Sequence, residues 1–187
     1  MIDFWVEFLK YSDVHFSFED GERVAVDKGC EEPTMIKGTV HLENEEIGDI
    51  ILYELYNDED FLSKCDFVSG DCEIIASVVC DESGAVSDEH LNDYSRGDNI
   101  IILDSIRIDE RYRNQGIGST LISNLSEMLE YQFGEFACIL LYAGDFEAAK
   151  KYGFDSPEYE EGSRRLVEFY ERLGFEHIDK NVMIYTL

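Results

Sequence analysis

The sequence predicts a single domain of mixed α/β class, in which helices flank a central β-sheet. Its 187 residues are 44% hydrophobic and include 2 prolines, which is enough apolar surface to bury one core. From Asp13 to about Tyr56, apolar and polar residues alternate as they do in half-buried strands. Beyond residue 100, an apolar run, a glycine-bearing turn, a helical pattern and a second apolar run predict a parallel β-α-β crossover.

The N-terminal half is predicted to hold strands followed by two short helices. Asp20-Gly21 is typical of a hairpin turn, and the polar residues 43–46 suit a second hairpin connection. Between Asp58 and Glu82, apolar residues recur at helical spacing, which predicts the two helices. Residues 83–99 are polar and turn-rich, so we expect a surface loop there. The predicted strands cover residues 14–18, 24–26, 35–42 and 47–56.

The C-terminal half is predicted to alternate strands and helices. Gly134 and Gly174 are expected to end the two helices, because glycine readily adopts the backbone conformation that terminates a helix. Residues 100–108 are predicted to form a central strand buried on both faces, since the run is almost wholly apolar. The other predicted elements are a helix from 117 to Gly134, a strand over 136–142, a helix over 163–173 and strands over 175–178 and 182–187.

The charge is strongly negative and unevenly distributed. The chain has 42 acidic and 15 basic residues, a formal net charge of -27. Residues 1–100 carry 26 acids and 6 bases, and residues 101–187 carry 16 acids and 9 bases. This excess argues against a protein that binds nucleic acid through a broad basic face and favours a cationic partner.

Targeting and metal signals are missing from the sequence. The N-terminus has no basic cluster ahead of an apolar core and no apolar run approaches the ~20 residues of a spanning helix, so we expect a cytoplasmic protein without a membrane partner. The cysteines are odd in number and form no CxxC pair, which predicts buried free thiols rather than disulfides or a zinc site. The histidines show no ligand spacing, so no metal is expected. These residues are Cys30, Cys65, Cys72, Cys80, Cys138, His15, His41, His90 and His177.

The turn from Arg111 to Gly118 is the most informative stretch of the chain. A glycine-bearing turn at a helix N-terminus directs several backbone N–H groups one way and adds the positive end of the helix dipole, so it can bind phosphate. A Cβ at Gly116 or Gly118 would block a pyrophosphate or penalise the backbone angles. Glycines at such a turn can also serve packing alone.

Two motifs resemble the GCN5-related N-acetyltransferase (GNAT) family. Residues 113–118 (RNQGIG) resemble its Arg/Gln-x-x-Gly-x-Gly/Ala pyrophosphate loop, and residues 169–175 (FYERLGF) resemble its helix-to-strand signature near the C-terminus. The resemblance covers roughly residues 100–187. It implies a splayed mixed sheet flanked by helices, with residues 1–99 as a divergent acceptor-side half and residues 100–187 as the half that binds acetyl-coenzyme A (acetyl-CoA).

The resemblance also implies which residues contact acetyl-CoA. The backbone of Ile106, Arg107 and Ile108 would pair with the pantetheine arm, which adds to the splayed gap like an extra strand. A backbone N–H of the same strand would face the thioester carbonyl and stabilise the oxyanion. The pyrophosphate would be surrounded by Arg113, Asn114, Gln115, Gly116, Ile117, Gly118 and Ser119.

The resemblance places Tyr170 where many family members have the tyrosine that protonates the departing thiolate. A phenol with a pKa near ~10 keeps its proton at neutral pH, so the role is physically reasonable. Tyr170 also shares an apolar helix face with Leu166 and Leu173, which is equally typical of core packing. For the base that deprotonates the amine, Asp104, Asp109, Glu158 and a chain of waters remain alternatives.

Three departures from the family pattern affect the cofactor side. Asn114 stands where a glycine is often found, and Ser163 stands where an asparagine is common. Residues 143–162 lengthen the connection that follows the return strand. We therefore expect an acetyl-CoA-dependent N-acetyltransferase that acts on a primary amine of a cationic acceptor, small molecule or protein, through a ternary complex. An acidic, non-enzymatic binding protein or nucleic-acid mimic on the same scaffold is the alternative, and a homodimer is compatible with either.

Overall fold

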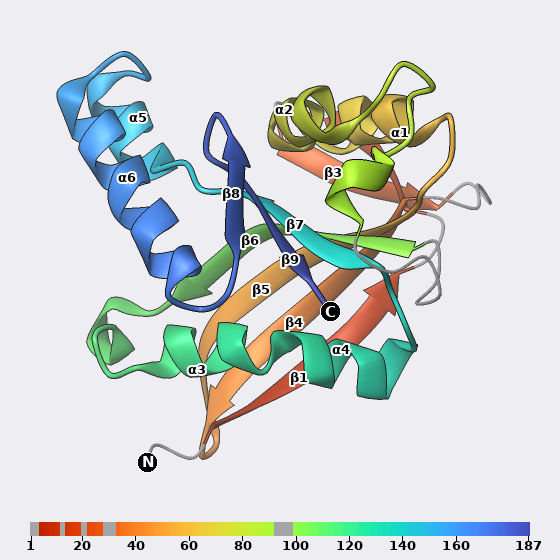
Figure 1. Ribbon diagram of the computed structural model, residues 1–187. Coiled ribbons are helices and arrows are strands. Elements are labelled where there is room, and N and C mark those ends of the chain that lie inside the picture. The colour runs from red at the N-terminus through yellow and green to blue at the C-terminus, as the bar shows by residue number, and fades with distance from the viewer. Residues whose placement is uncertain (1–3, 12–13, 20–21, 28–32, 92–98) are drawn as a thin grey trace.

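The protein folds around one seven-stranded sheet with the strand order β1-β4-β5-β6-β7-β9-β8 (Figure 1). In the computed structural model, residues 4–11, 14–19, 22–27, 33–91 and 99–187 are described. All neighbouring strands of this sheet are antiparallel except β6 and β7, which are parallel. The strands are β1 (Phe4–Tyr11), β4 (Thr34–Leu42), β5 (Glu45–Tyr56), β6 (Asn99–Ile108), β7 (Cys138–Tyr142), β8 (Glu176–Asp179) and β9 (Val182–Thr186); β2 (Val14–Glu19) and β3 (Glu22–Asp27) form a separate hairpin.

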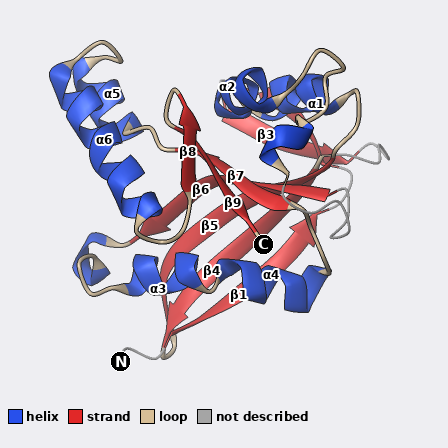
Figure 2. Ribbon diagram, viewed as in Figure 1, coloured by secondary structure: helices blue, strands red, loops and turns tan. Residues whose placement is uncertain are grey.

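Helices cover both faces of the sheet, which gives the mixed α/β single-domain fold expected from the sequence (Figure 2). Alternate residues of β6 separate the two cores: Ile101 and Leu103 pack with α4 and α6, whereas Ile100 and Ile102 pack with α1 and α2. None of the described helices is long and apolar enough to cross a membrane. The helices are α1 (Phe61–Val68), α2 (Gly70–Val79), α3 (Ile117–Ser123), α4 (Leu125–Phe133), α5 (Phe146–Tyr152) and α6 (Pro157–Glu171).

The sheet splays apart between β6 and β7. Their pairing runs only from Ile100 opposite Cys138 to Leu103 opposite Leu141, although β6 continues to Ile108. On the other side of β6, the register with β5 shifts at Asp104, because Leu52 opposes Leu103 and Ile51 opposes Ser105. This β-bulge adds one residue and bends the strand, so β6 turns away from β7 just where the pairing ends.

The bulge also changes which residues of β6 face each core. Ile101 and Leu103 face the α4 and α6 side before it, and Ile106 packs on that same side after it. Without the extra residue, strict alternation would place Ile106 on the opposite face. The predicted strand over 100–108 is thus confirmed, but its expected burial on both faces holds only for residues 100–103, because β6 leaves β7 after Leu103.

Most of the predicted elements are present, including both short helices after Asp58 and the parallel crossover. The cysteines Cys65, Cys72 and Cys138 are buried free thiols as predicted, and Cys80 is half-buried; Cys30 and the predicted Asp20-Gly21 turn lie outside the described residues. The predicted loop over 83–99 contains a 3₁₀ turn, Asp88–His90.

Four differences from the predictions have local physical causes. β1 was not predicted, because its outward residues Trp5 and Leu9 are apolar too and blur the alternation. The helix predicted from 117 to Gly134 is divided at Asn124, whose side chain donates to the Thr120 carbonyl at 2.6 Å. α5 was not predicted either. α6 begins at Pro157 rather than 163, since the Ser156 hydroxyl accepts the Tyr159 N–H at 3.2 Å and caps the helix there.

Candidate active site

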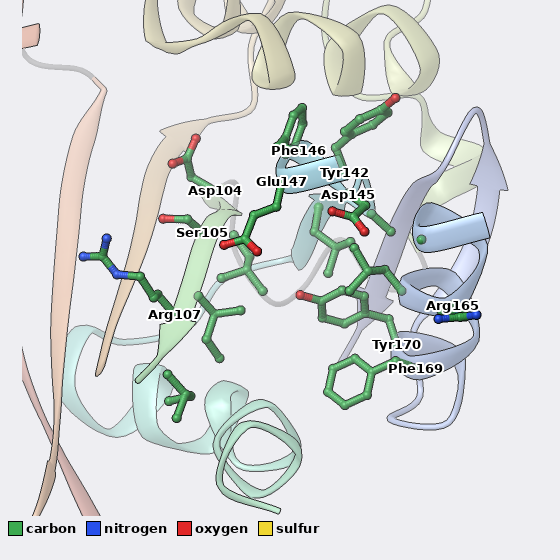
Figure 3. Close-up of a pocket in the computed structure, with 18 of the residues that line it drawn as sticks. Asp104, Ser105, Arg107, Tyr142, Asp145, Phe146, Glu147, Arg165, Phe169 and Tyr170 are labelled. Carbon is green, nitrogen blue, oxygen red and sulfur yellow. The ribbon is translucent and has the colours of Figure 1, made fainter. Parts of the chain in front are cut away.

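A cavity of about 700 Å³ opens where β6 and β7 diverge. Its walls are the end of β6, the end of β7 with the first turn of α5, and one face of α6 (Figure 3). The turn after β6 contributes Arg113 at one end. The cavity is therefore a direct product of the splay, because side chains and backbone that a continuous sheet would bury are left to line a space.

The splayed part of β6 turns toward this cavity backbone groups that no neighbouring strand pairs. The N–H of Asp109 donates to the Ile47 carbonyl of β5 at 2.8 Å. Because backbone groups alternate in direction along a strand, those of Arg107 also face β5, whereas those of Ile106 and Ile108 face the gap. The Ile108 carbonyl accepts a hydrogen bond from Arg113 Nε at 2.8 Å, which agrees with this direction. Of the three residues expected to contact a pantetheine arm through their backbone, Ile106 and Ile108 are so oriented.

The glycine turn has the backbone geometry of an open anion site. Asn114 has a φ of 60° and Gly116 a φ of 82°, both in the left-handed region. Asparagine tolerates this conformation better than most residues, which accounts for its place where the family often has glycine. A Cβ built at Gly116 or Gly118 meets no atom within 4 Å, so the space outside both glycines is open. Thr120 N–H donates to the Gly116 carbonyl at 2.9 Å, and the preceding N–H groups at the start of α3 have no intrahelical acceptor.

Side chains around this turn hold it against the sheet. Glu45 of β5 accepts hydrogen bonds from Arg111 and from the Tyr112 hydroxyl, both at 2.8 Å. These two bonds lower the pKa of Glu45, in the order Tyr112 then Arg111. Gln115 Nε2 donates to the Arg111 carbonyl at 3.0 Å, and Ile117 is buried against the sheet. Arg111 is thus a structural anchor of the turn, and of the two arginines in this turn Arg113 is the one that lines the cavity.

Tyr170 is packed in the core and also lines the cavity. Its ring packs edge-on against Phe169 and Phe175, with centroids 5.1 and 5.5 Å away, and the residue is only 7% exposed. Its hydroxyl nevertheless points into the cavity (Figure 3), and no described residue hydrogen-bonds it. Burial raises the pKa of Tyr170 to about 12, so the phenol keeps its proton at neutral pH.

The three carboxylates expected as alternative bases lie in different places. Asp104 lines the cavity at the bulge and accepts a hydrogen bond from the Ser69 hydroxyl at 3.5 Å. Asp109 is exposed and lies 3.7 Å from Arg111. Glu158 is exposed in the first turn of α6, and twelve residues of helix separate it from Tyr170 by about 18 Å. The structure brings Asp104 alone of these three to the cavity wall.

The segment after β7 contributes residues that sequence reasoning missed. Gly144, Asp145, Phe146 and Glu147 all line the cavity, and Tyr142 precedes them at the end of β7. The sequence signal was present: Asp145 is a favourable N-cap, and its carboxylate accepts the Ala148 N–H at 2.9 Å.

Ser163 fixes that segment to α6. Its hydroxyl, in a residue only 2% exposed, accepts the Asp145 N–H at 3.1 Å. Gly162 lies beside it, and a Cβ there would meet the Asp145 carboxylate at 2.1 Å. Ser163, which stands where the family commonly has an asparagine, therefore holds the start of α5 against α6.

The arginines that line the cavity are already engaged at its margin. Arg107 forms an ion pair with Asp49 at 2.5 Å, and Arg165 donates to Glu161 at 2.9 Å. In Figure 3 the side chains of both arginines point away from the space that Asp104, Glu147 and Tyr170 surround. The cavity consequently has two unlike ends: Arg113 and open backbone near the glycine turn, and carboxylates beside aromatic rings opposite α1 and α2.

The fold is a mixed sheet that splays open at a cavity, with a glycine turn at the start of the following helix. A family model described as "Acetyltransferase (GNAT) domain" matches residues 71–177, which is more than half of the chain. The chain therefore belongs to the GNAT acetyltransferases, a family that uses acetyl-CoA.

Solved structures with a related fold cover 81% of the chain at low identity. The KacTA–DNA complex matches with a TM-score of 0.43 and 12% identity over 67% of its own chain. Arabidopsis thaliana NAA60 in complex with acetyl-CoA has a TM-score of 0.43 and 13% identity over 76% of its chain. AtaT complexed with acetyl-methionyl-tRNAfMet has a TM-score of 0.41 and 12% identity over 71% of its chain. No curated protein sequence matches this chain significantly.

Proposed function

We propose that this chain transfers the acetyl group of acetyl-CoA to a primary amine of a cationic acceptor, by direct attack in a ternary complex. The observation that carries the proposal is the cavity of the splayed sheet. It is lined by Arg113 of the glycine turn at one end, by Tyr170 on one wall and by Asp104 on the other, and the space outside Gly116 and Gly118 is open. A donor site, a proton donor and a proton acceptor thus share one space.

The residues at the glycine turn fit acetyl-CoA. The pyrophosphate would be held by backbone N–H groups from Asn114 to Ser119, with Arg113 adding positive charge. The gap-facing backbone groups of Ile106 and Ile108 would pair with the amides of the pantetheine arm. When bound, acetyl-CoA supplies an acetyl thioester whose carbonyl carbon a neutral amine can attack, with loss of the thiolate.

Two side chains of the cavity would act as proton acceptor and proton donor. Asp104 would accept the proton that the amine nitrogen loses as its new bond to carbon forms. Tyr170 holds a proton at its hydroxyl, because burial keeps the pKa at about 12, and would donate it to the departing sulfur. Their placement on opposite walls fits a reaction in which attack and departure occur on either side of one carbon.

The charge distribution supports a cationic acceptor. The acidic excess is concentrated in residues 1–100, and within this half Ser69, between α1 and α2, contacts Asp104 of the cavity wall. A field of this sign raises the local concentration of cations and disfavours acidic amines. Asp104 itself lies at the corner between α1 and α2, where Ser69 contacts it.

Thiol release from acetyl-CoA in the presence of a panel of amines tests the proposal. We expect turnover with cationic primary amines, together with initial-velocity lines that intersect when both substrates are varied, as a ternary complex requires. Parallel lines would contradict direct attack and indicate an acetylated enzyme. Tight binding to basic proteins without any thiol release would favour the acidic binding protein instead. Mass spectrometry of the freshly purified protein for bound coenzyme A gives an independent check of the donor.

A further inference from the structure

We call the end of the cavity that carries carboxylates and aromatic rings the acceptor end. The first turn of α5 forms one of its walls. Phe146 and Glu147 follow the capping residue Asp145 and both line the cavity. In Figure 3 the carboxylate of Glu147 extends toward the β6 wall, while the ring of Phe146 lies beside Tyr142 on the side nearer α1 and α2. Sequence reasoning assigned the acceptor to residues 1–100, but these two side chains come from the other half of the chain.

Aromatic rings form a connected surface behind Glu147. Phe146 lies 5.9 Å from Tyr142 and 6.3 Å from Phe154, and Phe154 lies 5.4 Å from Tyr159, between ring centroids. The hydroxyls of Tyr142 and Tyr159 are 2.9 Å apart, which fixes that end of the cluster. Phe146 remains 37% exposed, and such a ring face beside a carboxylate is a favourable environment for an ammonium group.

The Glu147 carboxylate is exposed at this end of the cavity. No described residue forms an ion pair or hydrogen bond with it. Asp104 lines the cavity, and Asp71 in the first turn of α2 is close enough to feel its charge: the pKa of Asp71 is raised, first because burial desolvates it and second because Asp104 repels it. A cation bound between these elements would lower the repulsion that the empty site carries.

We propose that Phe146 and Glu147 bind a second ammonium group of the acceptor, so that the preferred substrates are aliphatic diamines and polyamines. This rests on the proposed amine acetylation. One amine lies at the reacting position near Asp104 and Tyr170. Tyr170 is only 7% exposed, and its hydroxyl has no hydrogen-bond partner among the described residues and points into the same space (Figure 3). The second ammonium, a few methylene groups away, contacts the Phe146 ring and the Glu147 carboxylate.

The position of these two residues is fixed by a compact set of contacts. The Asp145 carboxylate caps α5, its N–H donates to Ser163, and the absence of a side chain at Gly162 lets it approach α6. The first turn of α5 is thereby held against a long helix that also carries Tyr170. The spacing between the second-ammonium site and the reacting amine is consequently set by α6.

Substrate-length profiles of matched variants test this site. We expect kcat/KM for straight-chain α,ω-diamines to exceed that for monoamines of equal length. Glu147→Gln should reduce diamine kcat/KM by roughly 10-fold or more, through KM, and leave monoamine kcat/KM within about 2-fold. Phe146→Leu should cause a smaller loss of the same kind. Glu160→Gln is the control, because it removes an equal charge from the first turn of α6 at an exposed position outside the cavity.

The outcomes separate this proposal from the more general one. If no amine is acetylated, the proposed function fails and the second site falls with it. If monoamines and diamines are acetylated equally well, or if Glu147→Gln and Glu160→Gln have the same effect, amine acetylation stands and the second-ammonium site is wrong. Lysine-rich peptides acetylated better than every small diamine would also overturn it, since the acceptor would then be a protein.

Discussion

The two ends of the cavity are built from different parts of the protein molecule. At the donor end, the groups expected to bind are mostly backbone: the left-handed Asn114 and Gly116, the open position at Gly118 and the gap-facing strand residues Ile106 and Ile108. At the acceptor end the groups are side chains, with carboxylates and aromatic rings from β6, β7 and α5. A donor shared by a family can be held by conserved geometry of the main chain, whereas a particular acceptor requires particular side chains.

This difference predicts unlike responses to mutation. Changes at the donor end should alter the affinity for acetyl-CoA regardless of the acceptor. Changes at the acceptor end should alter the choice of amine and leave acetyl-CoA affinity unchanged. Tyr170 lies between the two ends, and its loss should reduce turnover without affecting either affinity.

The largest effect is expected from Tyr170→Phe. The change keeps the packed ring and removes only the hydroxyl, so we expect kcat to fall roughly 10²-fold or more, as for loss of a general acid. Acetyl-CoA affinity measured by calorimetry should be nearly unchanged. Tyr185→Phe is the matched control, because Tyr185 packs against Phe175 at 5.3 Å without lining the cavity. A kcat equal to that of the wild type would show that Tyr170 is a structural residue and not the proton donor.

The next effect is expected at the glycine turn. Gly118→Val places a side chain in open space at the start of α3 without backbone strain, whereas Gly116→Val would also strain a φ of 82°. We expect Gly118→Val to weaken acetyl-CoA binding at least about 10-fold, since the side chain occupies the space for an anion close to the backbone. Gly118→Ala should give a smaller loss. Unchanged calorimetric affinity in both variants, with a Tm near wild type, would show that the pyrophosphate does not bind at this turn.

A smaller effect is expected from salt. Because the field at the acceptor end is negative, cationic amines should have a several-fold higher kcat/KM than neutral amines of similar size at low ionic strength. This advantage should shrink as salt reaches physiological ionic strength, where the Debye length is about 8 Å. The affinity for acetyl-CoA provides the internal reference at each salt concentration. A preference for neutral or acidic amines, insensitive to salt, would mean that the acidity has another purpose.

The smallest effect concerns Asp71. Its pKa is raised in the folded protein by burial and by Asp104, so the ionised carboxylate costs stability at pH values above the folded pKa. Asp71→Asn should therefore raise the Tm slightly at pH 7, by about 1–2 °C for a half-exposed pair of like charges. The gain should disappear as the pH falls through the raised pKa toward the ordinary aspartate range, because the wild-type group is then protonated. A gain that is constant with pH in thermal melts would contradict this cause.

The sequence by itself determined the donor end and the order of the main elements. Left-handed backbone angles and the close approach of an anion to the main chain restrict the residue types allowed at the turn from Arg113 to Gly118. Because these residues are consecutive, the pattern can be recognised in the sequence. The strands of the crossover were equally readable, because burial on both faces demands continuous apolar residues. In each case the residues that satisfy the physical requirement are neighbours in the chain.

Only the tertiary structure decided the acceptor end. The bulge at Asp104 depends on the register of β5 against β6, and no local pattern in 100–108 marks it. Asp104 and Glu147 are two acids among 42, and they are distinguished solely by the fold that brings them to the wall of one cavity, with Asp71 near Asp104. Glu158 was as plausible a base as Asp104 by residue type, but it lies outside the cavity. Charge alone does not encode position, because long-range strand pairing and helix packing determine which carboxylates meet.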